Sequence, residues 1–136
     1  MDNKDWAKLM PKDKYDIVSV NTLGKLDDNT FELLLPDLFM WISDINWPVA
    51  SPIIELLSER PHKIVTSIKK HLGSTEIDDD LKYNILLYLI PKLPFDVQKD
   101  LVVDIQRIYC TPTDIEQAGA WEAASIFMDQ YKRFIL

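Results

Sequence analysis

The segment at residues 41–50 (WISDINWPVA) constrains the fold most, because it predicts the end of one helix, a turn and the start of the next. Asp44 and Asn46 are residue types typical of turns, and Pro48 suits the beginning of a helix. Trp47 adds a large side chain to fill the space at the joint. A chain built from such joints is expected to be a stack of helices rather than an enzyme with a deep pocket.

Apolar residues recur at helical spacing through nearly every segment between turns. After Pro61, for example, Ile64, Ile68 and Leu72 fall on one face of a helix and lysines take the other. Alternation at strand spacing is hard to find, and hairpin dipeptides such as Asn-Gly are absent. We therefore predict an all-α protein of about six or seven helices, with the apolar segment 81–90 at its centre.

One proline falls inside a predicted helix. Phe31, Leu34, Leu38 and Ile42 form a single apolar stripe that Pro36 interrupts. Because proline cannot donate to the preceding turn, we expect the helix to restart there.

A weak internal repeat places short polar residues at 34-residue intervals, at Asn46, Asp80 and Asp114. Each precedes a predicted helix, where its side-chain oxygen suits an N-cap. Tetratricopeptide repeats share this period but need a Trp, Leu-Gly and Tyr pattern that is missing here. We predict a HEAT-like stack of antiparallel helix pairs, an α-α superhelix, that forms one domain over residues 1–136.

The charge balance narrows the choice of partner. The 136 residues include 15 basic and 22 acidic ones, which gives a formal net charge of −7. Binding to a phosphate backbone depends on clustered Lys and Arg, so nucleic acid is not the expected partner. A basic protein surface is favoured instead.

Location is inferred from what the sequence does not contain. The N-terminal residues are charged where a signal peptide needs an apolar core. No apolar run approaches the roughly 18 residues of a membrane span. The lone Cys110 agrees with a reducing compartment. We expect a cytoplasmic protein that does not enter the membrane.

Residues 9–16 (LMPKDKYD), 38–50 (LFMWISDINWPVA) and 81–90 (LKYNILLYLI) resemble an uncharacterised bacterial family of small helical proteins, a domain of unknown function. The Asp-x-Asn-Trp-Pro-Val-Ala string is the most distinctive part of the resemblance, which runs from Leu9 to the final helix. The resemblance implies a HEAT-like helical fold and brings no established activity.

Candidate binding residues lie at two joints and on the helix after the second joint. They are Trp41, Asp44, Asn46, Trp47, Glu76, Asp78, Asp79, Lys82 and Tyr83. Tryptophan is favoured at binding hot spots, but a Trp at a helix joint also fills the wedge between helices. A carboxylate beside a turn also accepts backbone N–H groups. We assign Asp80 as the cap of its helix and leave Asp78 and Asp79 free for contact.

No metal site or cofactor is predicted. Asp78, Asp79 and Asp80 lack the spaced ligands and the glycine of a calcium loop. His62 and His71 are too far apart in sequence for the four-residue spacing of a zinc pair.

Function is left as three competing hypotheses. The first is a non-catalytic protein-interaction module. A specific form of it is an acidic immunity or antitoxin-like protein that blocks a basic toxin. The second is a small enzyme with a groove near Asp44 and Trp47, or one using Lys82 and Tyr83. The third is a HEAT-like nucleic-acid binder, which needs a basic cluster. The candidate cluster consists of Lys69, Lys70, Lys132 and Arg133.

Overall fold

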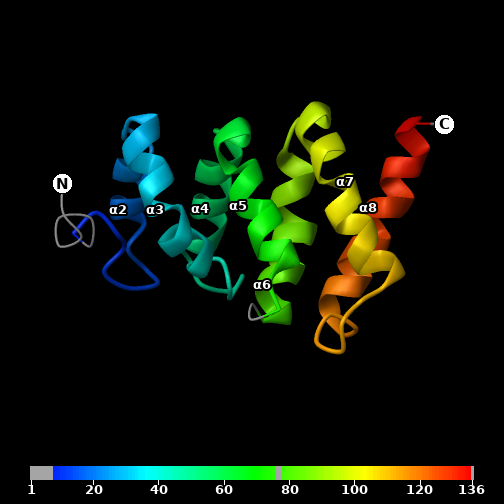
Figure 1. Ribbon diagram of the computed structural model, residues 1–136. Coiled ribbons are helices and arrows are strands. Elements are labelled where there is room, and N and C mark those ends of the chain that lie inside the picture. Colours follow the sequence, from blue (N-terminus) through cyan, green and yellow to red (C-terminus); the bar gives the residue numbers. More distant parts are fainter. Residues whose placement is uncertain (1–7, 76–77, 136) are drawn as a thin grey trace.

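Helices are the regular elements of residues 8–75 and 78–135, the part of the chain that the computed structural model describes, and no strand occurs there (Figure 1). The all-α prediction is therefore confirmed. The elements are α2 (Ile17–Leu23), α3 (Asp28–Met40), α4 (Ala50–Ser58), α5 (Pro61–Gly73), α6 (Asp79–Asn84), the π-helical turn η1 (Ile85–Leu89), the 3₁₀ turn η2 (Ile90–Lys92), α7 (Phe95–Cys110) and α8 (Gly119–Ile135).

The helices form two rows that run from α2 at one end to α8 at the other (Figure 1). In one row α2 contacts α4, α4 contacts η1, and α6 with η1 contacts α8. In the other row α3 contacts α5 and α5 contacts α7. Helix α7 also packs on α8, so that the two rows meet at the C-terminal end.

The joints that follow α3, α5 and α7 lie along one edge of the molecule, at the bottom of Figure 1. We call this the joint edge and define it by residues 41–49, 78–80 and 111–118. The shorter links after α2, α4 and η2 lie along the opposite edge.

The core follows the apolar stripes of the sequence. Ile64, Ile68 and Leu72 of α5 are fully or almost fully buried, as the helical spacing predicts. The segment expected at the centre is covered by α4 and by α8. Its residues Leu81 and Ile85 are likewise buried. Burial of these side chains is the main stabilising contribution.

Pro36 corrects one expectation. It lies inside α3, which continues unbroken from Asp28 to Met40. Pro36 is on the exposed side of the helix, so water solvates the carbonyl that loses its partner there. The helix therefore does not restart at this position.

Candidate functional site

A buried ion network joins α6, α7 and the joint before α8. Lys82 Nζ lies 2.6 Å from Glu116 Oε2, and Arg107 Nη2 lies 2.7 Å from the same oxygen. Lys82 is 2% exposed and Glu116 is 0% exposed. The backbone N–H of Thr113 donates to Glu116 Oε1 at 2.9 Å, so both carboxylate oxygens are occupied. Lys82, predicted as a binding residue, is therefore enclosed and already paired.

The network holds Glu116 in its ionised form. Burial alone would raise the pKa of Glu116, but hydrogen bonds from Arg107 and Lys82 outweigh it and lower that pKa to about 2. A carboxylate with so low a pKa is a poor proton acceptor near neutral pH. The physical role of these three side chains is to tie α6, α7 and the joint at residues 111–118 together.

Arg107 extends this tie to α5. Its Nη2 also donates to the carbonyl of Leu72 at 2.9 Å, near the end of α5. Sequence reasoning missed both Arg107 and Glu116. Lys82 and Glu116 are 34 residues apart, which is the spacing of the weak repeat. The repeat therefore put the two residues at corresponding positions, but it did not indicate that they form an ion pair.

Asp79 caps a helix that begins 40 residues later. Its carboxylate accepts from the N–H of Gly119 at 2.7 Å and of Ala120 at 2.8 Å, the first residues of α8. A Cβ at Gly119 would lie 2.7 Å from Asp79 Oδ2 and 3.1 Å from the Tyr83 ring. The close approach, rather than any unusual backbone angle, requires glycine there. Asp114, predicted as the cap of this helix, lies outside it.

The cap of α6 is also reassigned. Asp78 Oδ1 accepts from the N–H of Leu81 at 2.9 Å, and the backbone of Asp78 is extended, as in an N-cap. Asp80 falls in the first turn of the helix, and its side chain accepts no hydrogen bond from a described residue. Assigning Asp80 as the cap and leaving Asp78 and Asp79 free was therefore wrong.

The joint after α3 contains a short local turn. Asp44 Oδ1 accepts from the N–H of Asn46 at 2.9 Å, and both residues are exposed. Helix α4 begins only at Ala50, and its N-cap position, Val49, makes no side-chain bond. Asn46 is thus not a helix cap, because the turn that includes Trp47 separates it from the helix.

Trp41 and Trp47 pack against each other at this joint. Their ring centroids lie 5.7 Å apart in an edge-on arrangement. Both are half-buried against the core. They fill the wedge between helices and keep part of each ring at the surface.

Asn84 links the candidate residues of α6 to those of the joint after α3. Its side-chain amide donates to the carbonyls of Ile42 at 2.8 Å and Ser43 at 3.0 Å. Helix α6 is therefore fixed against the joint that carries Trp41 and Asp44.

Tyr83 is half-buried, and burial raises its pKa. Glu76 lies outside the described residues.

Exposed carboxylates remain along the joint edge. They belong to Asp44, Asp78, Asp80 and Asp114. Asp80 and Asp114 form no side-chain hydrogen bond or ion pair with any residue in the described ranges, and Asp44 and Asp78 each use an oxygen for a backbone N–H.

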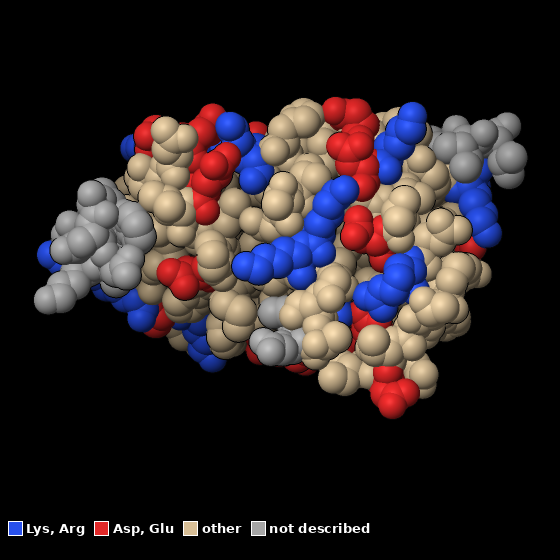
Figure 2. All heavy atoms as spheres, in the orientation of Figure 1, with Lys and Arg blue, Asp and Glu red and all other residues tan. Residues whose placement is uncertain are grey.

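Helix α5 carries several basic side chains. Figure 2 shows lysine and arginine gathered over the middle of the face that displays α5. Helix α5 has no acidic residue, and its Lys63 lies 3.5 Å from Glu32. Lys69 and Lys70 lie near the C-terminal end of α5, whereas α8 ends at the edge opposite the joint edge (Figure 1). The basic cluster predicted from α5 and α8 together does not form.

Within the described ranges, no three His, Cys, Asp or Glu side chains are arranged to hold a metal ion. None of the described helices has both the length and the apolar character needed to cross a membrane.

A family model described as a domain of unknown function, DUF5071, matches residues 9–127. The matched stretch includes the joint edge and the ion network of Lys82, Arg107 and Glu116. No curated protein matches the chain.

Proposed function

The chain belongs to the DUF5071 family, and from this premise we propose that it is a non-catalytic protein-interaction module built as a HEAT-like helical stack. The two rows of helices and the shared edge of the joints support a stack of this kind. Stacked helices offer an extended surface to a partner, and the ionisable groups at the centre of this one pair with each other.

The exposed carboxylates of the joint edge are the observation on which the proposal rests. Three joints contribute to this group, and the joints lie along one edge (Figure 1). Its exposed members are Asp44, Asp78, Asp80 and Asp114. A row of like charges attracts a surface of opposite charge and speeds encounter with it. We propose a basic protein as the partner.

An immunity or antitoxin-like role is the specific form of this proposal, in which a small acidic protein of the bacterial cytoplasm blocks a basic toxin. The net charge of −7 supports it by analogy. The turn of Asp44 and Asn46 beside Trp47 is the place where a small enzyme would need its groove, and Asp44 there is exposed and engaged with a backbone N–H.

The experiment compares capture of a partner by three forms of the protein in the native host. The edge variant is Asp80→Asn with Asp114→Asn, since these side chains carry no structural bond in the described chain. The control variant is Asp100→Asn with Asp129→Asn, exposed residues on α7 and α8 away from the joint edge. Both variants change the net charge equally.

We expect a partner, identified by mass spectrometry, to be retained by the unmodified protein and the control variant but lost from the edge variant. Equal retention by the edge variant would show that the joint edge is not the binding surface.

A further inference from the structure

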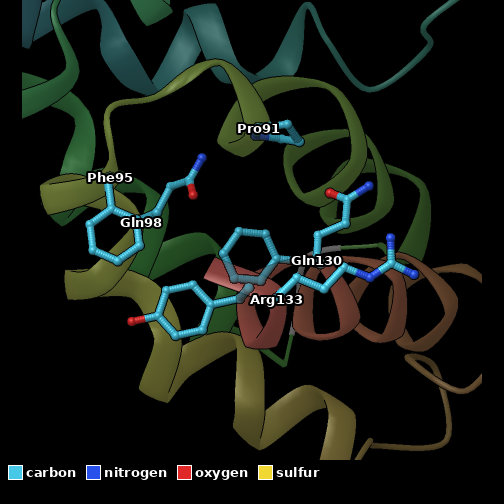
Figure 3. A pocket seen from close by; sticks show the side chains of 7 residues that line it. Pro91, Phe95, Gln98, Gln130 and Arg133 are labelled. Carbon is cyan, nitrogen blue, oxygen red and sulfur yellow. The ribbon is translucent and has the colours of Figure 1, made fainter. Parts of the chain in front are cut away.

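An open groove of about 770 Å³ lies between the start of α7 and the C-terminal half of α8 (Figure 3). Pro91, Phe95 and Gln98 stand across from Gln130 and Arg133 of α8. Phe127 and Tyr131 complete the lining. The groove lies toward the edge opposite the joint edge, so it is separate from the surface proposed above (Figure 1).

The apolar part of the groove is a ladder of aromatic rings. Phe95 and Tyr131 stack with centroids 5.7 Å apart and an interplanar angle of 10°. Tyr131 and Phe127 continue the ladder at 5.8 Å and 18°. Phe127 is 5% exposed and Phe95 is 47% exposed, so the ladder leads from the core to the surface. It leaves aromatic surface open to a further flat ring.

The polar part of the groove is a set of donors. The Gln98 amide is already used, because it donates to the carbonyls of Ile90 and Leu93, each at 3.1 Å. Gln130 and Arg133 are exposed and form no hydrogen bond or ion pair with any residue that the structure describes. Among the described residues, the lining contains one cation and no carboxylate, although the whole chain has a net charge of −7.

We propose that this groove binds a small aromatic carboxylate. A ring would extend the ladder at Phe95 and Tyr131, and the guanidinium of Arg133 would pair with the carboxylate in its two-pronged geometry. The volume falls within the roughly 300–1,000 Å³ of small-molecule sites. Gln130, Tyr131 and Arg133 lie beyond the stretch matched to the family, residues 9–127.

The test uses 2-naphthoate as the probe and 2-naphthamide as its uncharged counterpart, titrated into the full chain and followed by amide NMR shifts. The charge variant is Arg133→Gln. Its matched control is Lys132→Gln, which removes the same charge from the neighbouring residue, outside the lining. A second variant, Phe95→Ala, removes the exposed end of the ladder, with thermal melting used to confirm that it is folded.

We expect saturable binding of 2-naphthoate with shifts confined to η2, the start of α7 and the second half of α8. Arg133→Gln should weaken binding about fivefold, a modest factor because Arg133 is exposed, while Lys132→Gln changes it little. Phe95→Ala should weaken binding of both compounds. Absence of saturation, shifts elsewhere, or equal affinity for the acid and the amide would overturn the proposal.

Discussion

At the scale of single residues, Glu116 has the most demanding environment in the described chain. It is fully buried and ionised, and its charge is balanced by Lys82 inside the molecule and by Arg107 at the surface. Buried charges are costly to desolvate, so their stability depends on the pairing being complete. Removing one charge of the Lys82–Glu116 pair should therefore destabilise the fold more than removing both charges.

Glu116→Gln should lower the free energy of unfolding by about 3 kcal/mol, because Lys82 is then left as a buried charge without its counterion. Adding Lys82→Met should restore part of this loss, since the buried charge is gone and Arg107 reaches water. Denaturant titration of the single and double variants measures both effects. A single variant that unfolds at the same midpoint as the parent would contradict this account.

Acid should weaken the fold through the same carboxylate. The pKa of Glu116 is lowered from 4.5 to about 2, so its contribution is complete above about pH 4.5 and is lost as the pH falls toward 2. The loss should amount to about 3 kcal/mol over that interval. Hydrogen bonds from Ser19 and Thr30 lower the pKa values of Asp16 and Asp27, which act in the same direction.

Comparison with Glu116→Gln across the same pH series separates Glu116 from the other carboxylates. We expect the variant to lose less stability than the parent between pH 4.5 and 2. Parallel curves for the two proteins would show that Glu116 is not responsible.

At the scale of the elements, the start of α8 depends on a residue of α6. Asp79→Ala should destabilise the protein by about 1–2 kcal/mol, because two N–H groups of α8 lose their acceptor. Asp80→Ala is the matched control, since it removes the neighbouring carboxylate that forms no such bond, and should cost under about 0.5 kcal/mol. Equal melting temperatures for the two variants would rule out the capping role.

Helices from α3 onward were predictable from the sequence because their segments carry apolar stripes, whereas α2 was not identified. Ile64, Ile68 and Leu72 identify α5 without any knowledge of its neighbours. The start of α8 was not predictable in this way. Its acceptor, Asp79, lies on another helix, and local rules led instead to Asp114.

Pairing across helices was missed for a similar reason. Lys82 and Tyr83 were predicted as binding residues because the sequence does not reveal that Lys82 and Arg107 both pair with Glu116. Asn84, which binds the carbonyls of Ile42 and Ser43, gave no signal beyond being a polar residue in an apolar run. The sequence could place the candidate residues at two joints and on the helix after the second, but could not divide them into structural and exposed members.

At the scale of the whole molecule, the joint edge carries exposed carboxylates from three joints. If the joint edge attracts a basic protein, the association rate should fall steeply as the Debye length shrinks from ~10 Å at 0.1 M salt to ~3 Å at 1 M. The dissociation rate should change less. Stopped-flow mixing with the captured partner measures both rates, and an association rate independent of salt would favour an apolar interface.

The two ends of the hydrogen bonds between Asp79 and the start of α8 are synthesised at different times. During synthesis the chain leaves the ribosome from its N-terminus, so Asp79 emerges before Gly119, which follows 40 residues later. The acceptor is therefore outside the ribosome before the donors that need it. In a truncated chain that ends before residue 119, water solvates the Asp79 carboxylate, so the missing donors leave no buried charge. An isolated α8, by contrast, begins with N–H groups that have no acceptor within the helix. Assembly of this end of the molecule thus follows the direction of translation.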